Sequence, residues 1–211
     1  MKYLFGYALC LLFGLTLGCD RAPERPTAAL EDPAAAEEET AAPEPTGPRD
    51  QYVIDPDSEF TFTGYYVAGS QTGGFLVFDG HWEMHGDEVE TARSEVVFLT
   101  DTVYSSDDRL TRVLVGDAFF DSLDHPEGTF KLNRVRATDD GYTITGDLTL
   151  RGVTKTISFP AAIQVADDQV RIQAEFQVDR NWWEMGKGGL GDYALRDRVD
   201  IVIDVMANKE E

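Results

Sequence analysis

The sequence predicts an all-β fold, an antiparallel barrel or sandwich of roughly eight strands with one short helix, and three observations support this. Apolar and polar residues alternate over short segments from Tyr52 onward. Turn-forming pairs such as Asp139-Asp140 and Arg151-Gly152 separate these segments at hairpin spacing. A strand-like pattern also persists almost to the end of the chain. The candidate strands are 52–66, 73–85, 88–101, 128–138, 141–150, 153–165, 168–180 and 198–207.

The clearest hairpin lies in the stretch YTITGDLTLRGVTKTISFP, residues 142–160. Its apolar residues are Tyr142, Ile144, Leu148 and Leu150 before the turn and Val153, Ile157 and Phe159 after it. Threonine, aspartate and lysine are assigned to the opposite face. We therefore expect one apolar and one solvated face. The pattern leaves open whether the apolar face lies against a packed core, another sheet or a bound molecule.

Two later segments alternate as clearly, and one earlier segment breaks the rule. The apolar faces are Val170, Ile172, Ala174, Phe176 and Val178 in the first and Val199, Ile201, Ile203 and Val205 in the second. By contrast, Leu110, Val113 and Leu114 recur at helical spacing. This spacing predicts a short helix at about 108–115.

Residues 1–19 resemble a bacterial lipoprotein signal. Lys2 precedes an apolar run that is too short for a comfortable transmembrane helix, and the run ends at Gly18-Cys19. In such signals the cysteine is lipidated and becomes the first mature residue, so we expect lipidation at Cys19. An ordinary secretory signal that happens to contain a cysteine is the alternative. Because Cys10 is the only other cysteine, no disulfide or thiolate metal site is expected in the body of the protein.

Residues 20–50 predict a disordered acidic tether rich in alanine, proline and glutamate. They contain six of the nine prolines, no aromatic residue, and nine acidic against three basic residues. Such a segment buries too little apolar surface to offset chain entropy. The whole chain carries a formal net charge of −21, of which residues 51–211 carry −16. This charge argues against nucleic acid as a partner, and it makes the N-terminal lipid anchor the expected route to a membrane.

Residues 52 to about 207 resemble the YceI-like domain family, which binds lipids or polyisoprenoids in bacterial envelopes. The strongest elements are GDLTLRGVTKTISFP, ending at Pro160, and GDAFFDSLDHPEGTFKL, beginning at Gly116. Supporting elements are YVIDPDSEFTFTG, GGFLVFDG and VDRNWWEMG. The late GDYALRDRVDIVIDVMA is similar to the final strand of a subgroup of the family. Together with the signal (1–19) and the tether (20–50), this resemblance leaves 51–211 as the barrel domain.

The resemblance implies an eight-stranded antiparallel, lipocalin-like barrel with an elongated apolar interior that holds an isoprenoid, quinone or fatty-acyl chain. An eight-stranded barrel has room for packed side chains or for one small ligand. A barrel filled by its own side chains therefore stays open as an alternative. The residues expected at the barrel interior or mouth are Phe60, Phe62, Phe75, Phe78, Trp82, Phe98, Phe119, Phe120, Phe130, Ile144, Leu148, Ile157, Phe176 and Trp183. Inward and outward parity is not decided in GFLVFDG.

Other chemistry has weaker signals. His81, Glu83 and His85 alternate along one strand face and offer metal-ligand types, yet they do not form the helical zinc signature, so no metal site is expected. Arg151 and Lys155 near the hairpin turn suit either a phosphate head group or plain solvation. With no cysteine in the body and no G-x-S-x-G motif, we expect neither an enzyme nor a cofactor.

The sequence thus predicts a lipid-anchored protein on the periplasmic side of the bacterial cell envelope. Its barrel would sequester or transport an apolar lipid of isoprenoid, quinone or fatty-acyl type. The alternative is an envelope protein-interaction module whose filled barrel presents loops to a partner. The sequence decides neither the membrane that holds the anchor nor the oligomeric state.

Overall fold

The computed structural model describes residues 25–32, 47–67, 69–166, 168–187 and 195–210, so the predicted signal and Cys19 lie outside the described residues. The strands are β1 (Ala29–Leu30), β2 (Asp50–Ile54), β3 (Glu59–Tyr66), β4 (Gly69–Phe75), β5 (Phe78–His85), β6 (Glu88–Leu99), β7 (Val103–Ser105), β8 (Glu127–Thr138), β9 (Gly141–Leu150), β10 (Val153–Ala166), β11 (Gln169–Asp179) and β12 (Leu195–Lys209). The helices are η1 (Thr100–Thr102), α2 (Asp108–Val115) and η2 (Arg180–Trp183). The helix predicted at about 108–115 is therefore confirmed.

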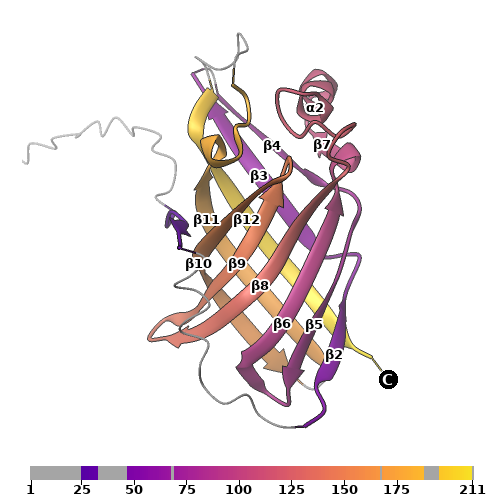
Figure 1. The fold of residues 1–211 in the computed structure, drawn as a ribbon, viewed down its shortest axis with the longest axis vertical. Helices are drawn as coiled ribbons and strands as arrows, with labels where there is room; N and C mark the ends of the chain where they lie inside the picture. Colours follow the sequence, from indigo (N-terminus) through magenta and orange to yellow (C-terminus); the bar gives the residue numbers. More distant parts are fainter. Residues whose placement is uncertain (1–24, 33–46, 68, 167, 188–194, 211) are drawn as a thin grey trace, which may run out of the picture.

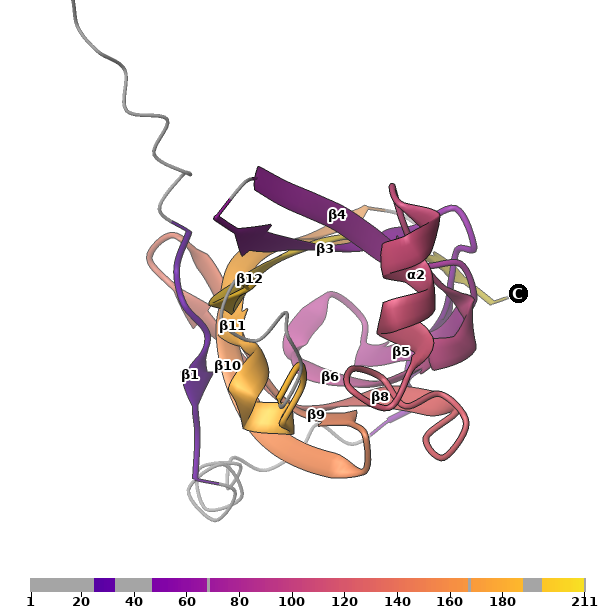
Figure 2. The same cartoon turned by 90° about the horizontal axis from the view of Figure 1, so that it is seen from above.

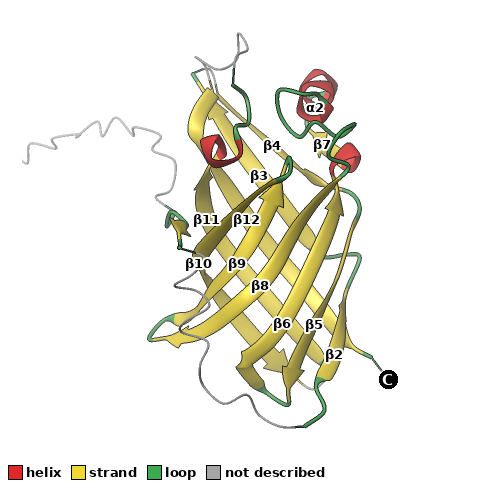
Figure 3. Cartoon of the chain, viewed as in Figure 1, coloured by secondary structure: helices red, strands yellow, loops and turns green. Residues whose placement is uncertain are grey.

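The sheet closes on itself as an eight-stranded antiparallel barrel, which confirms the predicted fold class (Figures 1 and 3). Its closed circuit of hydrogen-bonded neighbours is β2–β5–β6–β8–β9–β10–β11–β12 and back to β2. Strands β3, β4 and β7 extend the wall on one side, because β3 pairs with β12 and β4 pairs with both β3 and β7. Seen from above, the strands surround a central space (Figure 2).

Two of the predicted strands are each broken into two. Segment 52–66 is interrupted by a turn in which the Ser58 amide donates to the Asp55 carbonyl, and β2 and β3 then pair with successive parts of β12. Segment 73–85 is interrupted at Leu76 and Val77. The second break explains the undecided parity, because Phe75 and Phe78 both line the interior while Leu76 and Val77 are exposed.

The β9–β10 hairpin matches its prediction closely. It turns through Arg151 and Gly152, whose φ angles of 51° and 71° are those of a tight primed turn. Gly146 in β9 leaves room for a neighbouring ring, because a Cβ there would lie 2.4 Å from Phe130 Cζ. One assignment is wrong: Lys155 pairs with Leu148, so its backbone position has inward rather than outward parity. Lys155 lies two residues from both Val153 and Ile157, so strict alternation along the strand already places these three residues on the same face.

The barrel has two different ends. The end that carries α2 and η2 is called the helix end, and the end formed by the β5–β6, β8–β9 and β10–β11 turns is called the packed end (Figure 1). Fully buried side chains fill the packed end, among them Tyr52, Met84 and Val170. Neither α2 nor any other helix in the described segments has the length and apolarity needed to cross a bilayer.

Residues 25–32 lie against the outside of the barrel wall and are called the strap (Figure 2). β1 within the strap pairs with β10, and the Ala28 amide donates to the Gln177 carbonyl of β11 at 2.8 Å. For these residues the expectation of a disordered tether is wrong. The physical reason is that backbone pairing and an Arg25–Asp200 ion pair supply contacts that composition alone does not reveal.

Candidate functional site

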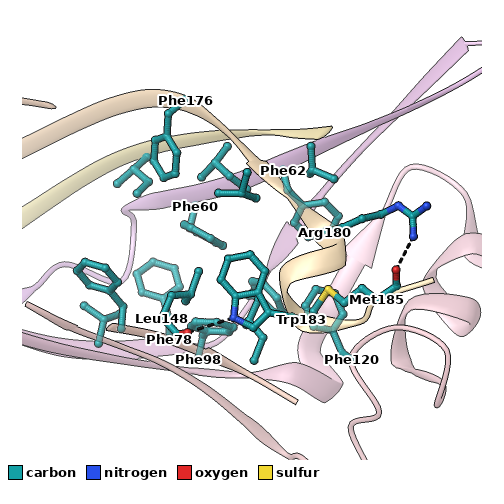
Figure 4. A pocket seen from close by; sticks show the side chains of 18 of the residues that line it. Phe60, Phe62, Phe78, Phe98, Phe120, Leu148, Phe176, Arg180, Trp183 and Met185 are labelled. Carbon is teal, nitrogen blue, oxygen red and sulfur yellow. Dashed lines mark hydrogen bonds between the residues drawn. The ribbon is translucent and has the colours of Figure 1, made fainter. Parts of the chain in front are cut away.

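The barrel interior between the two ends is an apolar cavity of about 460 Å³. This volume lies in the range of pockets that bind small molecules, roughly 300–1,000 Å³. The side chains that line it come from all strands of the closed circuit, from β3, β4 and β7, and from α2, η2 and the segments after these helices. Figure 4 shows how Phe60, Phe62 and Phe176 on one side approach Phe78 and Phe98 on the other.

All fourteen residues expected at the barrel interior or mouth line this cavity. Phe75 and Phe98 lie 4.5 Å apart between ring centroids, and Phe120 contacts Phe75 edge-on at 5.2 Å. Phe119 and Phe120 directly follow α2 and line the helix end, as the sequence suggested. The sequence pattern left open what the apolar face of the β9–β10 hairpin lies against, and the structure shows that this face lines the cavity.

Side-chain exposure shows that the cavity is not filled by the protein itself. Phe60, Phe130, Leu148 and Ile203 line the interior, and yet they remain partly exposed. A side chain that faces inward in a closed barrel keeps exposed surface only when the space in front of it is empty. The alternative of a barrel interior filled by its own side chains is therefore wrong for the part of the barrel that holds the cavity.

Several lining residues escaped the sequence-based selection. The apolar ones are Ile54, Tyr66, Val96, Leu110, Leu114, Leu132, Leu150, Phe159, Ile172, Val178, Met185, Leu195, Val199, Ile201, Ile203 and Val205, and the others are Gly64, Gln71, Ser94, Ser105, Asp107 and Arg180. Strand parity had already placed Ile172, Val178 and Ile203 on the apolar faces of their strands. Selecting whole inward faces instead of mainly aromatic residues would have found most of them.

Trp183 joins η2 to the cavity wall. Its side chain is 1% exposed, and its indole N–H donates to the Leu148 carbonyl at 3.1 Å (Figure 4). The indole ring thereby covers β9 at the helix end, and its N–H group has a hydrogen-bond acceptor. At the N-terminus of η2, the Asp179 carboxylate accepts a hydrogen bond from the backbone amide of Asn181 at 2.9 Å. This cap fixes the start of the turn that carries Trp183.

Polar lining residues gather at the helix end. Ser105 and Asp107 precede α2, and Gln71 lies on the neighbouring β4. The Arg109 amide donates to Asp107 Oδ1 at 2.8 Å, and this bond holds the pKa of the Asp107 carboxyl below its ordinary value. The cavity is thus amphipathic along its length, with apolar walls and a polar helix end.

Arg180 is the basic residue that lines the cavity among the described residues, and its guanidinium is already engaged. It donates to the backbone carbonyl of Met185 (Figure 4). It also donates to the carbonyls of Arg196 (3.2 Å) and Leu195 (3.4 Å) and pairs with Asp197 at 3.4 Å. Its side chain is 4% exposed. Arg180 therefore ties the segment after η2 to the start of β12.

The weaker sequence signals lie elsewhere. Arg151 donates to the Glu184 carbonyl at 2.9 Å, its Nε is buried without a partner, and it does not line the cavity. His81 and His85 are on the outer face of β5, where Trp82 and Met84 point inward. Among the residues described, no three His, Cys, Asp or Glu side chains gather closely enough to hold a metal ion.

Comparison with known proteins identifies the family. The model of the YceI-like domain matches residues 52–207. A UPF0312 protein of Yersinia pestis (strain Pestoides F) is 27% identical over 136 residues, which cover 62% of this chain and 71% of the relative.

Two solved structures share the fold. BcnA of Burkholderia cenocepacia has a TM-score of 0.68 at 18% identity, covering 74% of this chain and 99% of BcnA. A polyisoprenoid-binding domain from Saccharophagus degradans, implicated in plant cell wall breakdown, has a TM-score of 0.62 at 15% identity, covering 75% and 98%. The predicted resemblance is confirmed, and the chain belongs to the YceI-like domain family.

Proposed function

We propose that this protein binds one molecule of an apolar lipid in its barrel and sequesters or transports it. The observation that carries the proposal is the empty apolar cavity of about 460 Å³ inside a closed barrel. Burial of apolar ligand surface stabilises a complex by about 25 cal/mol per Å² before the costs of association. The Saccharophagus degradans domain, described as polyisoprenoid-binding, supports the same class of ligand.

The lining chemistry supports a ligand held mainly by its hydrocarbon chain. Phe60, Phe98 and Phe176 offer rigid rings that lose little entropy when they contact a flexible chain. The guanidinium of Arg180 already binds backbone carbonyls and Asp197. A polar head group would lie at the helix end, near Gln71, Ser105 and Asp107. An isoprenoid, a quinone or a fatty-acyl chain fits this arrangement.

We also propose that the protein is a lipoprotein of the bacterial envelope, anchored through Cys19 and facing the periplasm. The strap gives this proposal a geometric consequence. Arg25 is bound to the barrel wall through Asp200 and Glu175. Arg25 is six positions after Cys19 in the sequence, and six steps along the chain span at most about 21 Å. A lipidated Cys19 would therefore hold the barrel close to the bilayer surface, where a membrane lipid is available.

Native mass spectrometry with organic extraction tests the ligand. The sample is a chain that begins at residue 20, because this chain retains every residue that the structure describes. A lipid-sized adduct at one copy per barrel supports the proposal and names the ligand class. An apo mass, together with no uptake of added quinone, prenol or fatty acid, contradicts it. That result would favour the alternative of a protein-interaction module, and the next experiment would be a search for a protein partner.

A further inference from the structure

One seam of the barrel wall lacks its own hydrogen bonds. β10 and β11 pair directly from Ala166–Gln169 to Ala162–Gln173, and the ladder between them ends there. Both strands continue toward the helix end, because β10 pairs with β9 as far as Val153 and β11 pairs with β12 as far as Asp179. In the register of the paired part, Phe159 would lie opposite Phe176 and Ser158 opposite Gln177.

The strap occupies this seam from the outside. The Gln177 amide donates to the Pro26 carbonyl at 2.8 Å, and the Ala28 amide donates back to the Gln177 carbonyl at 2.8 Å. On the β10 side, the Glu31 amide donates to the Thr156 carbonyl at 2.9 Å, and Ala29 pairs with Ser158. The Ala28 side chain is 4% exposed and belongs to the core. The strap thus supplies the hydrogen bonds that β10 and β11 do not make with each other.

An ion-pair cluster fastens the beginning of the strap. Arg25 pairs with Glu175 at 3.0 Å and with Asp200, whose side chain is 1% exposed. Asp200 also accepts hydrogen bonds from the Tyr65 hydroxyl and the Gln177 side-chain amide, both at 2.8 Å. The hydrogen bond to Asp200 and burial together raise the pKa of the Tyr65 hydroxyl. Side chains from β3, β11 and the strap therefore contact one buried carboxylate of β12 at the edge of the seam.

The inner side of the same seam faces the cavity. Phe159 and Phe176 stack across it, with ring centroids 4.1 Å apart and planes at 9°. Both rings line the cavity, as do Ile157 and Val178 beside them. A side-chain stack on the inside and a two-residue strand on the outside thus close the seam, whereas the two flanking junctions, β9–β10 and β11–β12, have continuous ladders. Few hydrogen bonds at a surface segment mean a low free energy of local opening.

We infer that this seam is a side entrance to the cavity and that the strap is its removable closure. Tyr52, Met84 and Val170 block the packed end, and at the helix end α2 and η2 lie over different parts of the rim, where Leu114, Phe120 and Trp183 are buried. Release of residues 26–31 and rotation of two phenylalanine rings open a direct lateral path for a long chain. The inference rests on the proposed lipid binding. It adds that the N-terminal segment controls the rate of exchange.

A reversible cross-link tests the entrance. The chain that begins at residue 20 has no cysteine of its own, so Ala29→Cys with Ser158→Cys introduces one pair. Directly opposite residues in an antiparallel ladder have a Cα separation that a disulfide tolerates. The probe is cis-parinaric acid, displaced by excess oleic acid in a stopped-flow fluorimeter. We expect the oxidised protein to release the probe slower by about tenfold or more than the same protein after reduction.

Two further variants complete the test. Thr149→Cys with Thr154→Cys cross-links the β9–β10 ladder, where the two hydroxyls lie 2.8 Å apart, and should leave the release rate unchanged. A chain that begins at residue 33 lacks the strap and should release the probe faster. The inference of a side entrance is wrong if the strap variant releases the probe at the same rate when oxidised and reduced. It is also wrong if the control disulfide slows release equally. Neither result contradicts lipid binding itself. If the reduced protein binds no probe at all, the proposed function fails as well.

Discussion

The packed end and the helix end of this barrel are built from the same strands, and yet one is solid and the other encloses space. At the packed end, Tyr52, Met84, Val170 and Ala207 are at most 2% exposed and fill the interior. Toward the helix end, Phe60, Phe130, Leu148 and Ile203 face inward and keep part of their surface exposed. Strand pattern therefore sets the inward face, and the contacts across the barrel decide whether that face is packed or lines a cavity.

The largest expected effect comes from weakening the packed end. Met84→Ala removes a fully buried side chain that also accepts a weak hydrogen bond from the Trp82 indole at 3.5 Å. We expect a loss of about 3 kcal/mol in the free energy of unfolding, measured by urea denaturation. Ile203→Ala, in the cavity wall, should cost clearly less, because its side chain already faces empty space. Equal losses for the two variants would mean that the two ends do not differ in packing.

The next effect concerns the strap, which closes the wall nearer the helix end. Arg25→Met removes the cation that pairs with the buried Asp200. Loss of one partner of a buried ion pair lowers stability strongly, and the partial exposure of Arg25 makes the loss smaller. We therefore expect the free energy of unfolding to fall by about 2 kcal/mol. Hydrogen exchange at the Ala28 and Gln177 amides should accelerate in parallel. Arg109→Met, which alters an exposed pair with Asp107, is the control and should change neither quantity. Unchanged exchange in Arg25→Met would show that the ion pair does not hold the strap.

The third effect comes from filling part of the cavity with a large side chain, as the packed end is filled by its own residues. Ile203→Trp fills part of the cavity, and Val202→Trp places the same ring on the opposite face of β12. We expect Ile203→Trp to weaken binding of cis-parinaric acid by about tenfold while stability changes little. Equilibrium fluorescence titration measures the dissociation constant, and Val202→Trp should bind like the unchanged protein. Similar weakening by both variants would argue against the cavity as the binding site.

The smallest effect lies on the outer face of the barrel near the packed end, where the side chains are partly exposed. Arg171 donates to both carboxylate oxygens of Asp204, at 2.8 and 2.7 Å, and these bonds lower the pKa of that carboxyl. A lowered pKa in the folded state contributes stability above the unfolded pKa of about 4, and this contribution is lost as the pH falls through the folded value. The stability difference between the protein and Asp204→Asn should thus be constant above about pH 5 and shrink below about pH 4.

Denaturation curves across this pH range measure that difference. Both partners are partly exposed, so solvent screens the pair and the difference should be smaller than that for Arg25→Met. A difference that grows as the pH falls would contradict the assigned sign.

Much of the barrel could be predicted because alternation is a local property. The apolar faces of 168–180 and 198–207, the turn at Arg151-Gly152 and the helix at 108–115 all follow from neighbouring residues. The breaks at Asp55–Ser58 and Leu76-Val77 were missed, because each depends on which part of another strand lies alongside. The sequence does not reveal the structural role of Arg180, because that role depends on backbone carbonyls up to 16 residues away.

By itself, the sequence determined which apolar residues face inward in the regularly alternating strands, because the side-chain period of a strand is two and needs no knowledge of its neighbours. It also determined the family, through motifs that run along 52–207. Only the tertiary structure decided that these faces enclose empty space, since a void depends on how side chains from opposite walls meet. The same holds for residues 25–32. Their composition indicated disorder, and an unpaired seam between β10 and β11 gave their backbone groups hydrogen-bond partners.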